Sequence, residues 1–247
     1  MVYARFAGFY DAIMGDRTAD IDRIRGYIDR YLPSAASLLE LGCGTGAVLA
    51  GLADKLSATG IDLSPEMLAV ASRSIPGARL VQANMAAFAL DARFDVVICV
   101  FDTLNHLPDF ESWQRMFERV HEHLADDGIF AFDVNTTGRL RRLWRGHAFA
   151  VDFGPHAVVM DVLPAGVADG NELSTWTVRI FEHLNGNVYR SHAETIPELG
   201  VPLERIRAVL EPRFDLLEES ALDGGPVSDD SDRVFFVYRR KAVRTLP

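Results

Sequence analysis

The stretch from Leu38 to Gly46 constrains the fold more than any other part of the chain, and it reads Leu-Leu-Glu-Leu-Gly-Cys-Gly-Thr-Gly. An apolar run ends here at Gly42, Gly44 and Gly46, and residues 47–56 then carry valine and leucine at helical spacing. A buried strand, a glycine turn and a helix in this order are typical of the first unit of a nucleotide-binding α/β fold. Glycine serves in such a turn because a side chain would hold the ligand away from the backbone.

The glycine spacing and two nearby acids indicate which ligand this turn accepts. The pattern is Gly-x-Gly-x-Gly, whereas pyrophosphate binders carry Gly-x-Gly-x-x-Gly. Glu40 precedes Gly42 by two residues, and its carboxylate would repel a phosphate but suits an α-amino group or a sulfonium. Asp62 ends the next expected strand, 59–62, where its carboxylate can accept hydrogen bonds from ribose hydroxyls.

These motifs resemble those of the class I S-adenosylmethionine-dependent methyltransferases, with Glu40 to Gly46 as the first motif and Asp62 as the second. The resemblance implies an α/β fold, a Rossmann-like seven-stranded, mostly parallel sheet with helices on both faces, plus an antiparallel β insertion that covers the active site. It also implies S-adenosyl-L-methionine as cofactor. The residues expected to bind it are Tyr3, Tyr10, Glu40, Gly42, Cys43, Gly44, Gly46, Asp62, Leu63, Met67, Asn84, Met85, Val100 and Phe101.

Aromatic residues near the start of the chain lie at helical spacing. Tyr3, Phe6, Phe9 and Tyr10 are three or four residues apart, which fits either packing against the sheet or a lid over the site. Many small-molecule methyltransferases carry a Tyr-Asp pair in such a lid, here Tyr10 and Asp11. Through the resemblance, Tyr3 and Tyr10 are candidates to line the chamber, and a tyrosine ring can attract a sulfonium.

The adenine site departs from the family pattern. Relatives usually have an acid and an apolar residue after the third strand, and this chain has Asn84 and Met85 there. An amide oxygen can still accept a hydrogen bond from the adenine amino group, although a loop asparagine without such a role is the alternative.

The reacting groups are expected after the fourth strand, 94–101, because ligands of open α/β sheets lie beyond the carboxyl ends of the strands. The exit from this strand matches the family's fourth motif and contains Asn105 and His106. In sugar aminomethyltransferases that the chain resembles, a histidine at this position faces the substrate. His106 is thus the expected catalytic residue, a base for an ammonium or hydroxyl acceptor, unless it only caps the next helix. Asn105, and Asn135 at the end of the fifth strand, are expected to contact the acceptor.

Four arginines follow between residues 139 and 145 on an otherwise acidic chain. They suit a carboxylate or the diphosphate of a nucleotide-linked substrate, and Arg142 is the candidate we select. A charged run of this kind is also typical of a solvated helix face.

Residues 147–200 change to alternating strand patterns separated by turn signals, among them Asn185-Gly186, which predicts a hairpin. The block interrupts the α/β pattern and stands where related methyltransferases carry a substrate-covering sheet. Trp176 on it is a candidate to contact substrate, although the pattern leaves open which face does so. We expect three parts: residues 1–146 for lid helices and cofactor core, 147–200 for the insertion, and 201–247 for completion of the sheet.

Composition restricts partners and location. Acids outnumber bases 35 to 25, a net charge of −10, which argues against a nucleic-acid surface. No apolar run approaches the roughly 18 residues of a membrane helix, so no membrane partner is expected.

Cys43 and Cys99 suggest reduced thiols and a cytoplasmic location. His121 and His123 point to different sides of their expected helix, and no metal is expected. A homodimer is the commonest assembly, but no stretch identifies an interface.

The sequence therefore predicts a methyltransferase that moves a methyl group from S-adenosylmethionine to a small soluble acceptor by direct displacement. An amino sugar or a related natural-product intermediate is the expected acceptor, and methylation of oxygen or carbon is the alternative. From other classes, a non-catalytic S-adenosylmethionine-binding protein stays open, and a nicotinamide-dependent reductase is disfavoured by the glycine spacing.

Overall fold

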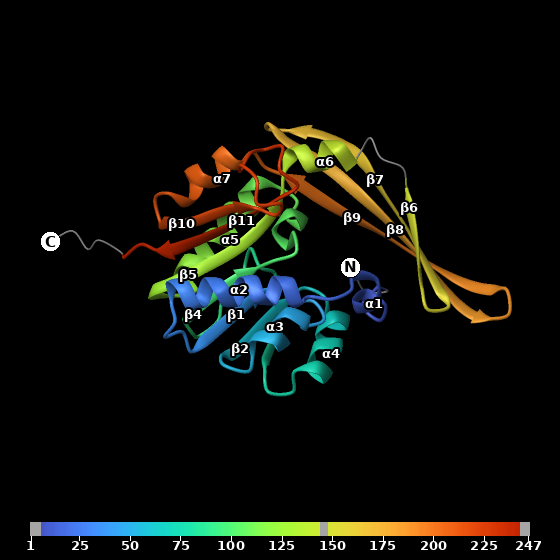
Figure 1. Ribbon diagram of the computed structural model, residues 1–247, viewed down its shortest axis with the longest axis horizontal. Helices are drawn as coiled ribbons and strands as arrows, with labels where there is room; N and C mark the ends of the chain where they lie inside the picture. Colours follow the sequence, from blue (N-terminus) through green and yellow to red (C-terminus); the bar gives the residue numbers. More distant parts are fainter. Residues whose placement is uncertain (1–5, 144–147, 243–247) are drawn as a thin grey trace.

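The computed structural model describes residues 6–143 and 148–242, and within them it forms two β-sheets (Figure 1). The larger sheet has seven strands in the order β10-β11-β5-β4-β1-β2-β3. Neighbouring strands are parallel except that β11 runs antiparallel to both β5 and β10. The smaller sheet is antiparallel, in the order β6-β7-β8-β9.

The strands of the larger sheet are β1 (Ser37–Leu41), β2 (Ser57–Asp62), β3 (Arg79–Gln82), β4 (Phe94–Cys99), β5 (Leu124–Asn135), β10 (Phe214–Ala221) and β11 (Arg233–Arg240). The strands of the smaller sheet are β6 (Phe149–Phe153), β7 (His156–Ala168), β8 (Asn171–Asn185) and β9 (Val188–Gly200). The helices are α1 (Tyr10–Met14), α2 (Thr18–Tyr31), α3 (Ala47–Leu52), α4 (Pro65–Ser74), the 3₁₀ helix η1 (Thr103–His106), α5 (Phe110–His123), α6 (Thr137–Leu143) and α7 (Leu203–Leu210).

Helices cover both faces of the larger sheet because alternate strand residues point to opposite sides. On β1, Leu39 packs into a cluster with α5 and α7, whereas its neighbour Leu38 packs with α2 and α3. Both side chains are fully buried. The predicted fold, a mostly parallel seven-stranded sheet covered on both faces and joined by an antiparallel insertion, is confirmed.

Helix starts around the site follow local capping chemistry. Ser64 caps α4 by accepting a hydrogen bond from the Met67 N–H at 3.2 Å, and proline opens the helix. Asp109 caps α5 by accepting from the Ser112 N–H at 2.6 Å. His106 therefore does not cap this helix, which removes that alternative for its role.

The smaller sheet projects from the body, and the N-terminal segment lies between the two (Figure 1). Phe6 is buried against the inner side chains of this sheet, and Phe9 and Tyr10 pack beside it. The hairpin between β8 and β9 differs from the prediction by one position. Gly186 and Asn187 connect the paired residues Asn185 and Val188, and Gly186 adopts the left-handed conformation with a φ of 50°.

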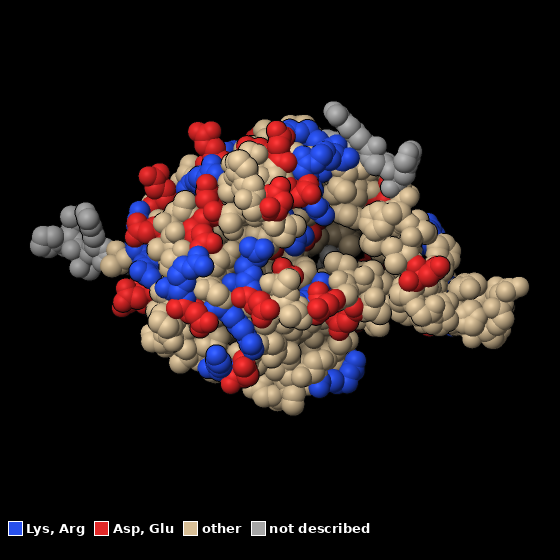
Figure 2. Space-filling view, in the orientation of Figure 1, with Lys and Arg blue, Asp and Glu red and all other residues tan. Residues whose placement is uncertain are grey.

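The surface between the body and the smaller sheet is hollowed, and charges of both signs are interspersed over the body on the face that Figure 2 shows. Over the residues described, the structure contains no helix of sufficient length and apolarity for a membrane crossing.

Gly138→Ala is expected to destabilise the fold by about 2 kcal/mol or more, since overpacking against backbone cannot relax easily. A Cβ at Gly138 would lie 2.4 Å from the Asp229 carbonyl oxygen and 2.8 Å from the Asp230 Cα. The matched control is Gly26→Ala, because Gly26 lies inside α2 with nothing within 4 Å of the added carbon. That change should stabilise the protein by about 0.5–1 kcal/mol. Denaturant unfolding of both variants measures the difference, and equal stabilities would contradict the packing described.

Candidate active site

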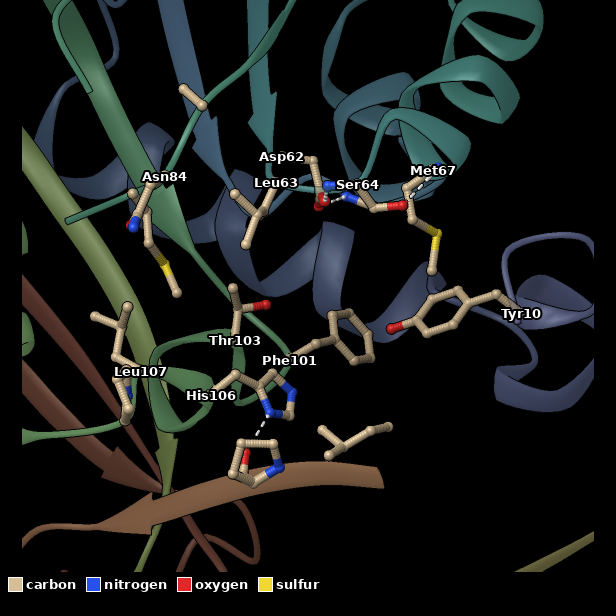
Figure 3. Close-up of a pocket in the computed structure, with 17 residues that line it drawn as sticks. Tyr10, Asp62, Leu63, Ser64, Met67, Asn84, Phe101, Thr103, His106 and Leu107 are labelled. Carbon is tan, nitrogen blue, oxygen red and sulfur yellow. Dashed lines mark hydrogen bonds between the residues drawn. The ribbon is translucent and has the colours of Figure 1, made fainter. Parts of the chain in front are cut away.

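A cavity of about 230 Å³ opens at the carboxyl ends of β1, β2 and β4. Figure 3 shows side chains from the N-terminal segment, the β2 end, the loop after β3 and η1 directed toward it. Its lining consists of Tyr10, Gly42, Gly44, Asp62, Leu63, Ser64, Met67, Ala83, Asn84, Met85, Phe101, Thr103, His106, Leu107, Pro108, Ile196 and Pro197. A smaller hollow adjoins it and shares Tyr10, Gly42, Gly44, Phe101 and Thr103.

The glycine turn gives the cavity a floor of bare backbone. Gly42 and Gly44 have φ values of 64° and 53°, which side-chain-bearing residues rarely adopt. A Cβ on Gly42 would lie 2.2 Å from the Thr103 Cγ2. The Cys43 N–H donates to the Ile61 carbonyl at 2.9 Å and ties the turn to β2. This position therefore requires glycine for both conformation and space.

Asp62 organises the turn and faces the cavity (Figure 3). Its two carboxylate oxygens accept hydrogen bonds from the Gly44 and Ser64 N–H groups, each at 2.8 Å. Burial raises the pKa of Asp62, and the two backbone donors oppose that shift. A carboxylate oxygen has further lone pairs, so Asp62 can still accept from a ligand's hydroxyl groups.

Glu40 lies beneath the turn in the smaller hollow and is 3% exposed. Its Oε2 is buried without a hydrogen-bond partner among the described residues. Burial raises its pKa to about 8, and the charge of Asp62 adds to this shift. A cationic ligand group beside Glu40 would favour its ionised form.

Arg17 is a site residue that sequence reasoning missed. Its side chain is buried in the same hollow, with the guanidinium 4.0 Å from the centroid of the Phe101 ring. One nitrogen, Nη1, donates to the Met14 carbonyl at 3.0 Å, while Nη2 is buried with no partner among the described residues. A buried cation and a buried acid thus flank the glycine turn, each with an atom left for a ligand. No sequence motif marks Arg17, because its place depends on how the N-terminal segment folds back.

The N-terminal segment is fastened to the glycine turn. Asp11 accepts a hydrogen bond from the Thr45 hydroxyl at 2.6 Å, and the adjacent Tyr10 lines both the cavity and the smaller hollow. Burial raises the pKa of Tyr10 to about 12, so its hydroxyl stays protonated near neutral pH. In the Tyr10–Asp11 pair, Tyr10 therefore lines the cavity, and Asp11 fixes the segment to the glycine turn through its hydrogen bond with Thr45.

His106 lines the cavity from η1, and its Nδ1 lies 3.3 Å from the Pro197 carbonyl oxygen on β9 (Figure 3). The turn before η1 is unusual, because Phe101 and Asp102 both have positive φ, 62° and 49°. Buried Asp133 holds this turn by accepting from the Phe101 and Asp102 N–H groups at 3.1 and 2.6 Å. Asp133 was not predicted, since only the pairing of the strands brings it to this turn.

The structure brings most of the predicted cofactor residues together. Those on the main cavity are Tyr10, Gly42, Gly44, Asp62, Leu63, Met67, Asn84, Met85 and Phe101, and those on the smaller hollow include Glu40, Cys43 and Val100. Gly46 lies on neither and packs against α4, where a Cβ would be 2.6 Å from the Ile75 Cδ1. Tyr3 lies outside the described residues.

The side chains predicted to touch the acceptor, apart from His106, lie away from the cavity lining. Asn105 is fully buried and links strand ends: its Nδ2 donates to the carbonyls of Asn135 and Leu199, and its Oδ1 accepts from the Asn135 N–H. The side chain of Asn135 lies between Glu198 and Arg233, with contacts of 3.4 Å to each. Both asparagines thus hold the framework of the site in this structure.

Arg142 is 49% exposed and forms an ion pair with Asp232 on the surface, as Arg141 does with Glu172. These pairs favour the solvated-helix interpretation of the arginine run, and Arg145 lies outside the described residues. Trp176 lies on β8 opposite Ile196, a cavity residue, and its side chain forms a hydrogen bond with Glu198 that lowers the pKa of that carboxyl group.

Comparison with known proteins identifies the class. A family model described as a methyltransferase domain matches residues 38–128. YqeM of Bacillus subtilis, whose name places it among the methyltransferases, is 30% identical over 244 residues, 96% of each chain. A dTDP-3-amino-3,6-dideoxy-alpha-D-glucopyranose N,N-dimethyltransferase of Streptomyces fradiae is 36% identical over 128 residues, 50% of each chain. The crystal structure of an S-adenosylmethionine-dependent methyltransferase from Clostridium acetobutylicum has the same fold, with a TM-score of 0.84, 22% identity, and coverage of 97% and 99%.

The chain belongs to the class I S-adenosylmethionine-dependent methyltransferases. The predictions of a methyltransferase and of S-adenosylmethionine as its cofactor are confirmed.

Proposed function

We propose that the protein methylates a small soluble acceptor, an amino sugar or a related natural-product intermediate, at a site between the glycine turn and β9. The observation that carries this proposal is the pair of buried groups flanking the turn. Arg17 Nη2 and Glu40 Oε2 are both without partners among the described residues, and they match the two charges of an amino acid's carboxylate and ammonium.

The methionine part of the cofactor would lie over this turn, with its carboxylate toward Arg17 and its ammonium toward Glu40. Asp62 would accept from the ribose hydroxyls. Asn84 and Met85 lie in the same cavity for the adenine, although Asn84 Oδ1 already accepts from the Ala86 N–H at 2.8 Å. A second lone pair on that oxygen can accept from the adenine amino group.

The acceptor would enter from the side of His106 and Leu107, under the strand that carries Ile196 and Pro197. This placement makes the smaller sheet the substrate-covering part of the molecule, as in the three-part division proposed from the sequence. The Streptomyces fradiae relative is named for an amino sugar substrate, which supports an acceptor of this kind.

The chemical step is a direct displacement. A lone pair of the acceptor forms the bond to the methyl carbon, the carbon–sulfur bond breaks, and its electrons go to sulfur, leaving S-adenosylhomocysteine. Alignment of the three atoms in a dry site supplies most of the acceleration. His106 would take the proton that the acceptor loses.

An acceptor screen tests this proposal. The protein is incubated with S-adenosylmethionine and pairs of nucleotide-linked sugars that differ only in amine against hydroxyl. Formation of S-adenosylhomocysteine and of a methylated sugar, analysed by mass spectrometry, reports transfer. Transfer to amines supports the proposal, transfer only to hydroxyls makes the protein an O-methyltransferase, and tight cofactor binding without transfer to any member contradicts this acceptor class.

Cofactor binding is expected to tighten as pH rises from about 6 to about 8. Glu40 is protonated in the empty site below its pKa of about 8, so binding a cation beside it must release a proton, and affinity gains up to about tenfold per pH unit. Calorimetry in buffers of different ionisation enthalpy measures that proton. Glu40→Gln should abolish the pH dependence, and a proton count unchanged by this substitution would contradict the role of Glu40.

The raised pKa of Glu40 also makes the folding stability of the empty protein depend on pH. This stability falls as the pH rises, whereas the affinity for the cofactor increases. Because the pKa of Glu40 is raised from 4.5 to about 8, the folded state binds this proton more tightly than the unfolded state does. The stability that it contributes is fully present below about pH 4.5 and is lost as pH rises toward about 8.

The cysteines, the charge of the chain and general frequencies of assembly bear on location and partners. Both cysteines, Cys43 and Cys99, are free and buried, which is consistent with a cytoplasmic enzyme. A small acceptor rather than a nucleic acid fits the acidic balance of the chain. A homodimer stays a prediction from general frequencies.

A further inference from the structure

Two carboxyl groups, one partly buried and one fully buried, lie in a cluster beside His106, and the function proposed above gives them no role. Asp102, His106 and Glu198 each offer one ligand atom, and these atoms lie within 4.8 Å of one another. His106 also lines the cavity, as do Ile196 and Pro197, which precede Glu198 on β9. The cluster therefore borders the cavity at its acceptor end.

The cluster holds more negative charge than its arginine neutralises. Arg233 lies 2.5 Å from the Asp102 Oδ1 and 3.5 Å from the Asp133 Oδ2, so one guanidinium serves two carboxylates. Glu198 adds a third carboxyl group. A hydrogen bond with Trp176, and then the charge of Arg139, oppose the upward pKa shift of this carboxyl group.

Glu198 has an atom left for a ligand. Its side chain is 2% exposed, and its Oε2 is buried with no hydrogen-bond partner among the described residues. Its Oε1 accepts a long contact of 3.4 Å from the Asn135 Nδ2. Burial of this carboxyl group therefore has a desolvation free energy that its present hydrogen bonds do not offset. Burial, then the charge of Asp102 and a hydrogen bond with it, raise the pKa of Glu198 well above its usual range.

A further polar atom nearby is also without a partner among the described residues. Ser174, paired with Glu198 across the β8–β9 ladder, has a buried hydroxyl, whereas the Trp176 side chain forms a hydrogen bond with Glu198 that lowers the pKa of that carboxyl group. Buried polar atoms are rarely left unsatisfied in native proteins, and when several gather beside a cavity they indicate a polar ligand. A partner that carries positive charge suits this position, because two carboxyl groups face it and a nearby cation would favour their ionised forms.

We propose that Asp102 and Glu198 hold the ammonium group of the methyl acceptor beside His106, so that the acceptor is an amine. This inference rests on the function proposed above and narrows it from three possible acceptor atoms to nitrogen. A divalent metal is a less suitable occupant, because the Arg233 guanidinium that contacts Asp102 repels a double positive charge about twice as strongly as the single charge of an ammonium.

The arrangement also accounts for the proton that an ammonium must lose before it can attack. A proton passes from the bound ammonium to His106, whose ring nitrogen lies within 4.8 Å of an oxygen of each carboxyl group, and this leaves a neutral amine. The nitrogen lone pair then forms the bond to the methyl carbon, and the electrons of the carbon–sulfur bond go to sulfur. The products are S-adenosylhomocysteine and a methylated ammonium, which carries the charge that the sulfonium has lost.

The test compares two cofactor analogues, S-adenosylhomocysteine and sinefungin. They differ at the methyl-transfer position, where sinefungin carries an ammonium group on carbon and S-adenosylhomocysteine has only sulfur. The wild-type protein is expected to bind sinefungin about tenfold more tightly, since charge-assisted contacts in a buried site are strong. Calorimetry at one pH and one salt concentration gives both dissociation constants.

Glu198→Gln and Asp102→Asn should each reduce that preference to about onefold or twofold while leaving S-adenosylhomocysteine affinity within about twofold. Both substitutions keep the shape of the side chain, and asparagine tolerates the left-handed backbone of residue 102 as aspartate does. The matched control is Asp127→Asn, an exposed residue on β5 with the same change of charge, which should keep the wild-type preference.

A sinefungin preference that survives in both variants would overturn the proposal, and so would an equal loss of both ligands, which indicates a structural role. Titration of the wild-type protein with Mn²⁺ distinguishes the metal alternative: tight binding that Glu198→Gln abolishes would assign the cluster to a metal instead. A wild-type protein that bound neither analogue would overturn the cofactor site itself, and with it this inference.

Discussion

Asp62→Ala is expected to weaken S-adenosylmethionine binding about 100-fold, the loss of two hydrogen bonds to a charged acceptor at about 1.5 kcal/mol each. The carboxylate also orients the cavity floor, because it accepts the Gly44 and Ser64 N–H groups. Both donors would lose their partner in the variant, so part of the effect comes from a less ordered turn. Calorimetric titration of wild type and variant measures the difference.

The matched control is Asp54→Ala, which removes the same charge from an exposed ion pair with Arg25. Surface pairs of this kind contribute about 1 kcal/mol or less, and cofactor affinity should not change. Thermal unfolding of both variants without ligand shows whether the fold is intact. An Asp62→Ala variant that stayed folded and bound the cofactor as tightly as wild type would remove Asp62 from the site.

His106→Ala is expected to lower kcat about 100-fold, within the usual range for loss of a general base, while the cofactor dissociation constant stays nearly the same. The effect on kcat without an effect on cofactor affinity follows from the positions of the residues in the cavity. His106 enters the cavity from η1, on the side of Pro197, whereas Asp62 and the glycine turn lie at the ends of β1 and β2. Steady-state kinetics with an identified acceptor, together with calorimetry, measures both quantities.

His183→Ala serves as the control for histidine removal, because His183 lies near the hairpin end of β8 and contacts the Gly186 carbonyl at 2.9 Å. It should leave kcat unchanged. Full turnover by His106→Ala at every pH would exclude a role in proton transfer, and an equal loss of cofactor binding and turnover would indicate that His106 supports the cavity wall instead.

The features predicted correctly from the sequence are local ones. Strand, glycine turn and helix follow one another between Leu38 and Leu52, so chain order alone predicts the start of the fold and the glycine turn. The exit from β2 is equally local, with Asp62 at the strand end and Ser64 and Pro65 opening the next helix. Such signals depend on residues that are neighbours in the chain.

The features that sequence reasoning missed depend on contacts between distant segments. Glu198 meets Asp102 only because β9 returns to the end of β4, and Arg17 reaches the glycine turn only because the N-terminal segment folds over it. Asn105 illustrates the opposite error. A polar residue within a known motif was predicted to face substrate, but its amide is used by backbone groups of β5 and β9. The sequence does not show which polar side chains the framework already occupies.

The central claim is that the cavity beside the glycine turn holds S-adenosylmethionine, with Arg17 and Glu40 on its two charged ends. Titration of the wild-type protein and of Arg17→Gln with S-adenosylmethionine tests it most directly. The account predicts a dissociation constant of about micromolar order for the wild type and binding about tenfold or more weaker for the variant, because the cofactor carboxylate loses a buried charged donor. Equal affinities would contradict the placement of the cofactor, and absence of binding to the wild type would contradict the site as a whole.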